Sequence, residues 1–267
     1  MKNKIGIFSW FGYELPFQAR LSLIKQAGFD ATFIWLGDEE QLVREGKKHL
    51  LPEFVNTLDL YLDSAHAPYQ NCIHIWNENL IKRVKRVDAF KKDIDFCTKY
   101  SVPQLVMHIT GSGIDFVPNE HGLKSIESII NHAKDCNITI SIENARFPQF
   151  HDYVFERIKS PALKMCYDSG HDFIRSNNPT KILNDWGSSM SCTHFSDNDG
   201  VDDLHLTPGT GVINWEKIFR NFPNDYSGTI MLESKSSDLK NETPDLYLEK
   251  AYQAAVWLRD SLVSIKN

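Results

Sequence analysis

The sequence lacks any long hydrophobic run. None of its 267 residues belongs to a segment that approaches the length of a membrane-spanning helix. The N-terminal residues MKNKIGIFSW lead directly into a strand-like run, without the apolar segment and small-residue cleavage site of a signal peptide. We therefore expect a chain that neither crosses a membrane nor carries a secretory leader.

Cysteine is scarce, and no paired-cysteine motif is present. The five cysteines stand singly in the sequence: Cys72, Cys97, Cys136, Cys166 and Cys192. An odd number of scattered cysteines is typical of reduced thiols in a cytoplasmic protein, and this is the location we predict. Cys166 and Cys192 lie inside predicted strands, so we expect them to be core thiols.

Excess positive charge and nucleotide-binding motifs are also missing. The formal net charge is −6, which gives no general attraction to nucleic acids or anionic membranes. No glycine-rich phosphate loop follows a predicted strand, so we expect no nucleotide cofactor. A Gly-x-Ser-x-Gly motif, which would indicate a serine hydrolase, is absent as well. The proportions of hydrophobic (42%) and charged (24%) residues are typical of a globular protein.

Short apolar runs recur along the chain and predict eight strands. Their ranges are Lys4–Ser9, Asp30–Leu36, Tyr61–His66, Gln104–His108, Ile138–Glu143, Leu163–Asp168, Ser189–Phe195 and Thr229–Glu233. Helical segments separate them, which favours parallel pairing with right-handed crossovers. Eight such units close most naturally as a single (β/α)8 TIM barrel, and a doubly wound open sheet is the alternative. No change in composition marks a linker, so we expect residues 1–267 to form one domain.

The helical segments are predicted from apolar residues at helical spacing. Their ranges are Pro16–Ala27, Asn77–Tyr100, Glu120–Cys136, Asp152–Ile158, Pro179–Asp185, Trp215–Phe222 and Thr243–Ser264. Helical material is also predicted after Leu36, with Pro52 marking a fresh start and Phe54, Val55 and Leu58 forming an apolar stripe. In the long segment Asn77–Tyr100 we expect Leu80 and Val84 on the buried side and Arg86 on a basic, solvated face. In the last segment we expect Leu246 to point inward. Gly28 and Asn214 are expected to cap helices at their C-terminal and N-terminal ends respectively.

Metal-ligand residue types stand at or just after the ends of six of these strands. The set contains nine residues: His66, His108, Glu143, Asp168, His171, His194, Asp203, His205 and Glu233. Any one of them alone is more often an ordinary polar group, but nine at equivalent places indicate a common site at one mouth of the barrel. Imidazole with carboxylate suits zinc, manganese or cobalt better than calcium. The innermost four are expected to be Glu143, Asp168, His194 and Glu233.

The motifs around these residues resemble the xylose isomerase-like TIM-barrel superfamily over nearly the whole chain. The segments that carry the resemblance are AGFDATFIW, SIEN, YDSGH, HFSDNDGVDDLHLTPGTGVINW and LES. The superfamily includes sugar isomerases and epimerases, inosose-processing enzymes and the endonuclease IV branch. In the isomerase and epimerase branch, the matches to Glu143, Asp168, His194 and Glu233 bind one divalent metal. The two glutamates there also move protons, and the match to His171 contacts the substrate.

The endonuclease IV branch implies a different use of the same residues. Its trinuclear zinc site has matches to all nine, in three sets. The first set is His66, His108 and Glu143; the second is Glu143, Asp168, His194 and Glu233; the third is His171, Asp203 and His205. The resemblance therefore leaves open two functions, a sugar isomerase or epimerase and a phosphodiesterase that cleaves abasic-site DNA. A barrel that binds a metal or ligand without catalysis is a third alternative.

The rim loops favour the isomerase or epimerase, acting on a small keto sugar, sugar phosphate or polyol. A DNA-binding face needs many basic residues, and the rim has few: Arg146, Arg175, Lys235 and Lys240. Acidic residues outnumber them there: Asp38, Glu39, Glu40, Glu78, Asp115, Asp172, Asp197, Asp199, Asp202, Asp238 and Glu242. Segment 195–201 contains no arginine, whereas the sugar 3-epimerases carry one there, so the resemblance leaves the substrate class open. Dimers and tetramers are common in the resembling families, and a homo-oligomer remains an expectation.

Substrate contacts are expected from polar and aromatic residues of the rim. We predict that His171, Arg146, Trp10 and Trp35 bind the substrate, with Glu143 and Glu233 as the catalytic residues. Further aromatic residues of the same loops are Phe11, Tyr13, Tyr69, Trp76, Phe116, Phe147 and Phe173. We expect many of these to pack between barrel and helices rather than to line the site.

Overall fold

Eight parallel strands form the centre of the protein, and each occupies the place that the sequence predicts. The computed structural model describes residues 2–111 and 117–264. The strands are β1 (Ile5–Phe8), β2 (Ala31–Trp35), β3 (Tyr61–His66), β4 (Gln104–Met107), β5 (Thr139–Glu143), β6 (Leu163–Asp168), β7 (Met190–His194) and β8 (Ile230–Leu232). They lie side by side in the order β7-β6-β5-β4-β3-β2-β1-β8. The predicted TIM barrel is therefore confirmed, and the open-sheet alternative is wrong.

The barrel closes between β7 and β8 through a short contact near the mouth. Phe195 pairs with Leu232 in a parallel bridge, where its N–H donates to the Met231 carbonyl at 2.8 Å and its carbonyl accepts from Glu233 N at 3.0 Å. One step deeper, the Met231 N–H donates to Thr193 Oγ1 at 3.0 Å. A threonine hydroxyl thus supplies a hydrogen bond that a backbone carbonyl supplies elsewhere in a parallel sheet.

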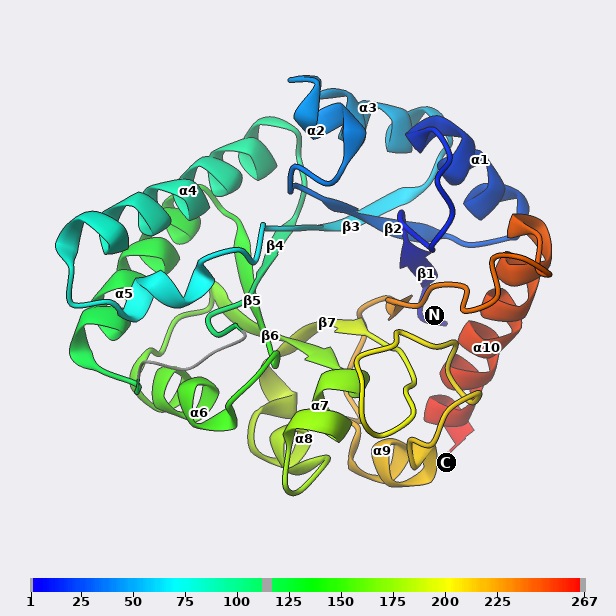
Figure 1. Cartoon of the computed structure of the whole chain (residues 1–267). Coiled ribbons are helices and arrows are strands. Elements are labelled where there is room, and N and C mark those ends of the chain that lie inside the picture. The colour runs from blue at the N-terminus through cyan, green and yellow to red at the C-terminus, as the bar shows by residue number, and fades with distance from the viewer. Residues whose placement is uncertain (1, 112–116, 265–267) are drawn as a thin grey trace.

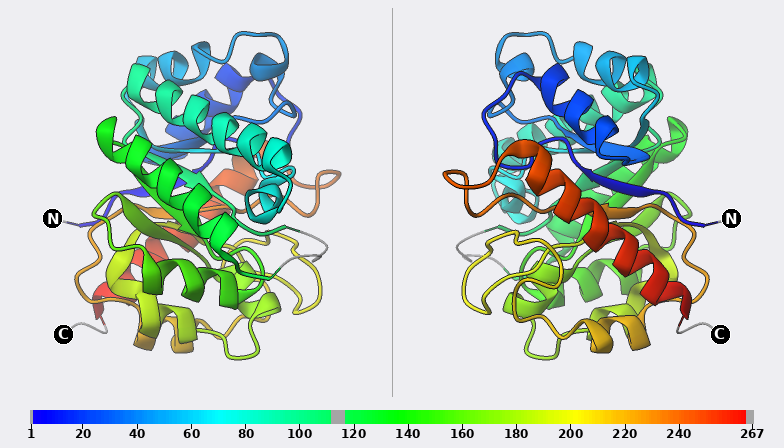
Figure 2. Two further views of the ribbon diagram at one scale, coloured as in Figure 1. Left: turned by 90° about the vertical axis from the view of Figure 1, so that its left-hand side faces the viewer. Right: turned by 90° about the vertical axis from the view of Figure 1, so that its right-hand side faces the viewer.

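Helices surround the strands as a ring (Figure 1). They are α1 (Phe17–Gln26), α2 (Gln41–Arg44), α3 (Leu50–Thr57), α4 (Leu80–Lys99), α5 (Glu120–Asp135), α6 (Pro148–Arg157), α7 (Ser169–Arg175), α8 (Lys181–Trp186), α9 (Trp215–Asn221) and α10 (Pro244–Ser264), with 3-10 turns η1 (Cys72–Trp76) and η2 (Gly187–Ser189). The loops after β7 and β8 protrude at the end of the barrel away from both termini (Figure 2). No helix in the described ranges has the length and apolar character needed to cross a membrane.

Most predicted helices are present, but some of their bounds differ and the short helix α7 was not predicted. The segment predicted at Asp152–Ile158 begins four residues earlier, at Pro148, which suits the first turn because it needs no N–H donor there. α7 was not predicted, and α2 falls in helical material that was predicted without bounds, because seven and four residues are too short for a clear apolar period. Gly28 follows the C-cap of α1 at φ +100°, and Asn214 caps α9 by accepting from Lys217 N, as predicted.

The buried face of α4 differs from the prediction. Leu80 and Val84 are exposed, with 61% of the Leu80 surface accessible, whereas Arg86 is only 8% accessible. The Arg86 guanidinium lies 3.8 Å from the centre of the Phe90 ring and donates to the Pro68 carbonyl, so its aliphatic stem serves as core surface. In α10, Leu246 is likewise exposed at 42% rather than inward. Leu80 and Leu246 both lie in the first turn of their helix.

The inside of the barrel is layered, because strand residues two apart share a face. One step below the site residues His108, Asp168 and His194 lie Val106, Cys166 and Cys192, which form one buried apolar cluster. All five cysteines, each within the described part of the chain, are free thiols, as expected.

The opposite end of the barrel interior is polar. The Asp63 carboxylate accepts from Thr229 Oγ1 at 2.6 Å and from Gln104 Nε2 at 3.1 Å. Gln104 Oε1 accepts from Ser141 Oγ at 2.9 Å, and Ser141 Oγ lies 2.7 Å from Ser191 Oγ. These bonds tie together β3, β4, β5, β7 and the residue before β8. The floor of the barrel is therefore a hydrogen-bonded network, and the site at the mouth rests on the apolar layer between.

We predict that Thr193→Val weakens barrel closure. The substitution keeps the side-chain shape but leaves the buried Met231 N–H without its acceptor, which should cost about 1–3 kcal/mol of unfolding free energy. Urea unfolding followed by circular dichroism measures this. Thr57→Val, at an exposed position near the end of α3, is the matched control and should change stability by less than about 0.5 kcal/mol. Equal stability of the two variants would contradict the role assigned to the hydroxyl.

Candidate metal centre

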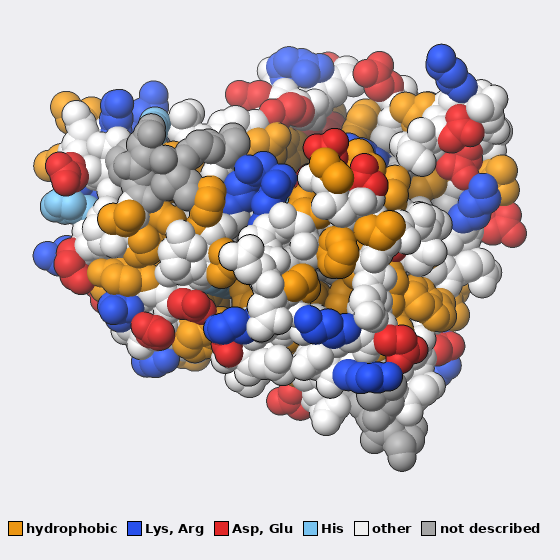
Figure 3. Space-filling view, turned by 60° about the horizontal axis from the view of Figure 1, so that its bottom comes forward, with side chains coloured by type: hydrophobic (Ala, Val, Ile, Leu, Met, Phe, Trp, Pro, Cys, Tyr) orange, Lys and Arg blue, Asp and Glu red, His pale blue; other side chains and the backbone are white. Residues whose placement is uncertain are grey.

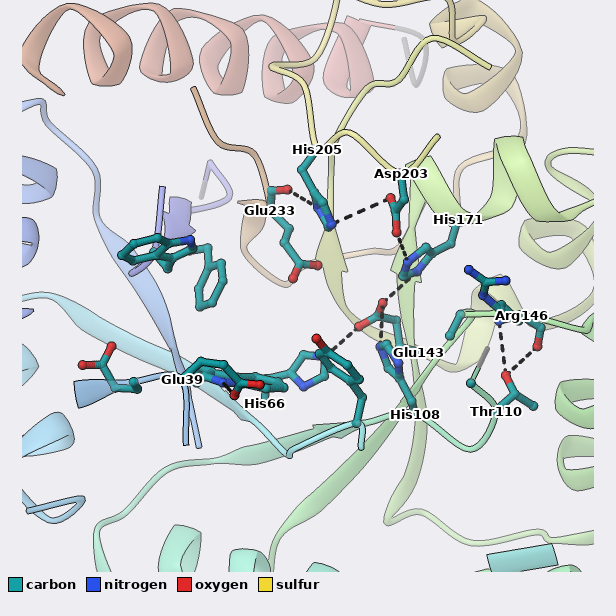
Figure 4. A pocket seen from close by; sticks show the side chains of 17 residues that line it. Glu39, His66, His108, Thr110, Glu143, Arg146, His171, Asp203, His205 and Glu233 are labelled. Carbon is teal, nitrogen blue, oxygen red and sulfur yellow. Dashed lines mark hydrogen bonds and ion pairs between the residues drawn. The ribbon is translucent and has the colours of Figure 1, made fainter. Parts of the chain in front are cut away.

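Glu143, the last residue of β5, lies at the centre of the cluster at the barrel mouth. Its Oε2 atom is 3.1 Å from His66 Nε2 and 3.0 Å from His194 Nδ1. Its Oε1 atom is 3.1 Å from His108 Nε2 and 2.9 Å from His171 Nδ1. Figure 4 shows His66, His108 and His171 converging on this carboxylate from three different elements. One carboxylate therefore meets four imidazoles.

A second carboxylate reaches the same place from β8. Glu233 Oε2 lies 3.0 Å from His194 Nδ1, the nitrogen that also contacts Glu143. Glu143, Asp168, His194 and Glu233 each offer a ligand atom, and these atoms all lie within 4.8 Å of one another. The structure thus brings together the four residues that the sequence predicts to be innermost. Their role as ligands stays a prediction.

The donor set fits a divalent cation. Asp168 is fully buried at 0% accessibility, and within the described residues its Oδ2 atom has no hydrogen-bond partner. A buried carboxylate oxygen without a partner is costly unless something else satisfies it. One imidazole with three carboxylates is a set that zinc, manganese and cobalt accept. These four residues would hold the ion.

Neighbouring residues fix the position of Asp168. Its Oδ1 atom accepts from His171 N at 2.6 Å and so caps α7. Asn144, the residue after Glu143, pairs with the Asp168 backbone in both directions: its side chain donates to the Asp168 carbonyl at 2.8 Å and accepts from the Asp168 N–H at 2.7 Å. The ends of β5 and β6 are therefore locked together, which holds two of the predicted ligands in register.

The His194 ring is held by apolar packing. It stacks on Phe33 with ring centres 4.4 Å apart, and Phe33 in turn stacks on Phe8 at 4.3 Å. Phe33 belongs to a small buried cluster with Ala31 and Met231. The imidazole orientation is thus set by β1, β2 and β8 together, so that Nδ1 faces both glutamates.

Protonation in this cluster reflects its crowded charges. Burial raises the pKa of Asp168 to about 7, with the nearby carboxylates adding to the effect of burial. Burial opposes ionisation of Glu143, but His108 and His194 outweigh it and hold its pKa well below the usual value. Burial alone would lower the pKa of His194, yet the two glutamates raise it well above the ordinary value. Without a cation, protons balance the negative charge, and a bound dication would release them.

Cys166 lies near Glu143 and His194 and is the one sulfur within reach of them in the described chain. Burial and the neighbouring Cys192 raise the pKa of its thiol well above the ordinary value. A thiol must lose its proton to bind a metal. We therefore regard Cys166 as part of the apolar layer below the site and not as a ligand.

The remaining predicted residues lie beside this centre. His66, His108 and Glu143 form a second group whose ligand atoms lie within 4.8 Å of one another. Asp203 Oδ2 is 3.0 Å from His171 Nε2, and its Oδ1 is 3.7 Å from His205 Nε2. The other nitrogen of His205 lies 2.9 Å from the Glu233 carbonyl. All nine predicted residues thus share the barrel mouth.

The loop that carries Asp203 and His205 is organised by Asp197. The Asp197 carboxylate accepts four hydrogen bonds, from Asn198 N, Gly209 N, Ile213 N and Trp215 Nε1, at 2.9–3.1 Å. Its backbone also pairs with Leu206 in both directions at 2.8 Å. Gly211 is required here, because a Cβ atom would lie 2.2 Å from the Asn198 carbonyl oxygen. Asp197 therefore has a structural role in the loop, whereas Asp203 and His205 of the same loop face the site.

A cavity of about 560 Å³ opens above the cluster. Its aromatic wall includes the predicted Trp10 and Trp35, together with Tyr69 and Phe8. Trp35 Nε1 donates to Glu39 Oε2 at 2.9 Å, and its ring lies 5.3 Å from that of Tyr69. The Arg20 guanidinium lies 5.0 Å from the Trp10 ring centre. These contacts fix the orientation of the Trp35 and Trp10 rings, which border a space large enough for a small sugar.

Several aromatic residues expected near the site lie elsewhere, and other lining residues were missed. Phe11 and Trp76 are fully buried in the core, as packing residues. Phe116 and Asp115, from the predicted aromatic and acidic sets, lie outside the described residues. Phe8, Glu39 and Thr110 line the cavity but were not predicted as binding residues. Phe8 ends β1, so its place at a strand end was the available signal.

Comparison with known proteins agrees with this architecture. The family model described as xylose isomerase-like TIM barrel matches residues 21–260. The uncharacterised protein y4fM of Sinorhizobium fredii is 26% identical over 297 residues, covering 96% of this chain and 92% of that protein. A D-tagatose 3-epimerase-like protein has a TM-score of 0.76 at 21% identity, with 98% of each chain covered. The IolI protein with a bound zinc atom has a TM-score of 0.76 at 17% identity, covering 96% of this chain and 98% of that one. These structural likenesses establish the fold.

We predict that a divalent cation stabilises the chelator-treated protein. An ion that binds only the folded chain, supplied at 100 times its dissociation constant, adds about 2.7 kcal/mol to the unfolding free energy. Thermal unfolding with and without zinc, manganese or cobalt measures this. Asp168→Asn should lose most of the shift, whereas Glu39→Gln, which changes a carboxylate of the cavity rim, should keep it. An unchanged shift in Asp168→Asn would show that the ion binds elsewhere.

Proposed function

The chain belongs to the xylose isomerase-like TIM barrel family, and on this premise we propose that it is a divalent-metal-dependent isomerase or epimerase of a small keto sugar, sugar phosphate or polyol. Solved structures of similar fold include L-ribulose 3-epimerase, with a TM-score of 0.75 at 16% identity. At that identity the likeness concerns the fold, so the proposal depends on the arrangement of the site itself.

The observation that carries the proposal is the pair of glutamates at the floor of the cavity. Glu143 and Glu233 both line it, and each has an oxygen 3.0 Å from His194 Nδ1. They come from β5 and β8, which two strands separate. Two carboxylates that approach one point from different strands can remove a proton from one side of a carbon and return it on the other.

The chain's own residues would perform the proton transfer. When bound, a divalent cation would polarise a carbonyl and an adjacent hydroxyl, and so lower the barrier to losing the proton between them. Glu143 is favoured as the base, because His108 and His194 keep its pKa well below the usual value and hence keep it ionised. Glu233, whose pKa is lowered by His194 despite burial, would act on the opposite face.

Residues in the walls of the cavity would orient the substrate. His171 is held between Glu143 at 2.9 Å and Asp203 at 3.0 Å, so its ring is fixed while one edge faces the cavity. Trp10 and Trp35 offer flat apolar surfaces of the kind that pack against sugar carbons. We propose that these three residues set the position of the reacting carbon between the two glutamates.

A trinuclear zinc phosphodiesterase is the second candidate. The group formed by His66, His108 and Glu143 favours it, since it offers ligand atoms for a further ion beside the first. Against it, the cavity that these residues line is bordered by Glu39 and Glu40 and by aromatic rings. A DNA backbone requires many cations along its path, and this border offers few.

We predict that Glu143→Gln and Glu233→Gln each lower turnover by about 10²–10⁴-fold, because an amide cannot accept the substrate proton. Turnover and deuterium uptake from heavy water are measured on a panel of ketoses and ketose phosphates. Metal content is determined in parallel, so that loss of the ion is separated from loss of the base. Glu249→Gln, at an exposed position on α10, is the control and should retain most activity. Full turnover in both catalytic variants would exclude the mechanism.

Metal counting separates the two candidate functions. We predict one ion per chain by elemental analysis of protein purified without chelator, together with epimerisation or isomerisation of at least one sugar on the panel. Three ions per chain with cleavage of an abasic-site duplex would instead establish the phosphodiesterase.

A further inference from the structure

A second cavity, of about 320 Å³, adjoins the one above the metal centre. It lies between the loop after β5, the start of α6, the end of α7 and the start of α8. The two cavities share five lining residues, which are Thr110, Glu143, Ala145, Arg146 and His171. A molecule whose reacting carbons lie at Glu143 can therefore extend past Arg146 into the second space. On the face drawn in Figure 3, a group of Lys and Arg side chains lies near the upper centre, close to Asp and Glu side chains.

Two arginines of the second cavity have no anionic partner. Among the residues that the structure describes, neither the Arg146 nor the Arg175 guanidinium makes a hydrogen bond or ion pair, and Arg175 Nε is a buried donor without an acceptor. The Arg146 backbone is nevertheless fixed, because Thr110 Oγ1 donates to its carbonyl at 2.7 Å and accepts from its N–H at 3.2 Å (Figure 4). Burial and the charge of Arg175 lower the pKa of Arg146. The two cations are therefore close enough to repel each other, and the charge of Asp203 offsets this only in part.

The carboxylates that also line this cavity are already occupied. Asp152 accepts from Trp186 Nε1 at 2.8 Å, and Asp185 pairs with Lys181. Asp172 accepts from Tyr167 Oη at 3.0 Å and from Thr180 N at 2.7 Å. Each of these three acids thus has a hydrogen-bond or ion-pair partner, whereas the Arg146 and Arg175 guanidinium groups have none among the described residues.

His151 adds an uncharged donor to the same wall. Its side chain lines the cavity and is 4% accessible, yet neither ring nitrogen has a hydrogen-bond partner in the described chain. Burial lowers its pKa to about 4, so the ring is neutral and carries one N–H at neutral pH. A buried polar ring with both nitrogens unsatisfied is a costly arrangement that a ligand oxygen would relieve.

We propose that the second cavity binds an oxyanion, a phosphate monoester or a carboxylate, at the far end of the substrate, with Arg146, Arg175 and His151 as its donors. Guanidinium groups match the planar spacing of two oxyanion oxygens, and charged hydrogen bonds of this kind are the strong ones. The proposal rests on the proposed isomerase or epimerase function, and it restricts the substrate to acidic sugars or sugar phosphates. Arg146, which lines both cavities, would mark the boundary between the reacting end and the charged end.

Titration calorimetry of the metal-loaded protein with inorganic phosphate, and separately with acetate, tests the site. Arg146→Gln and Arg175→Gln should each weaken binding of the preferred anion at least about tenfold, since each loses a charged donor pair. Arg157→Gln is the matched control, because Arg157 lies on α6 outside the cavity and pairs with Glu156. Arg175→Lys, which keeps the charge but loses the fork, should fall between. Equal affinity in wild type, Arg175→Gln and Arg157→Gln would overturn the proposal, since the anion would then be bound at the metal alone.

Turnover assays distinguish this inference from the function on which it rests. Ketose phosphates, sugar acids and neutral ketoses of the same carbon number are compared, and Arg175→Gln should raise KM for the charged members only. Turnover of neutral ketoses with no preference for charged ones would leave the isomerase standing and refute the anion site. Phosphate binding that depends on Arg175, without turnover of any sugar, would support the anion site and refute the isomerase.

Discussion

The arrangement of this protein depends on one buried carboxylate. Glu143 is surrounded by four imidazoles at 2.9–3.1 Å, each from a different segment of the chain. A charge in the interior is tolerated only where partners surround it. The strands that close the barrel are the means by which residues 77 positions before Glu143 and 51 positions after it reach the same point. The fold therefore determines the chemistry of the site, because opening the barrel between β7 and β8 would separate His194 from Glu233.

The supporting contacts are divided between polar and apolar residues. Asn144 locks the end of β5 to that of β6, while Phe33 and Phe8 hold the His194 ring by stacking. Neither kind alone would suffice: hydrogen bonds fix the backbone to which a ligand is attached, and ring packing fixes the angle of the side chain. Preorganisation of this kind is what lets a site bind its ligands without first rearranging.

The sequence alone was sufficient for the strands and for the cluster, and for a common reason. A TIM barrel places every strand end on one face, so His66, His108, Asp168 and Glu233 could be assigned to a single mouth without knowing any distance. The sequence could not distinguish structural from site residues within one loop. Asp197 and Asp203 look alike in the segment after β7, yet the first accepts four N–H groups and the second faces His171. Their difference arises from backbone direction, which residue types do not encode.

The same limit explains why the face of α4 was misjudged and why the second cavity was not predicted. Arg86 reads as a surface cation until Phe90 and the Pro68 carbonyl are placed beside it. Arg146 and Arg175 are 29 positions apart in the sequence, and their proximity follows only from the turn at α6 and the end of α7.

The hydrogen bonds that Asp197 accepts within the loop after β7 have a consequence for how the protein can evolve. The tip of this loop, residues 199–202, is exposed and lies outside the part that Asp197 holds. Insertions there can therefore change the entrance to the barrel while the predicted metal ligands keep their positions. Descendants of this chain could thereby change what they admit long before they change what they do.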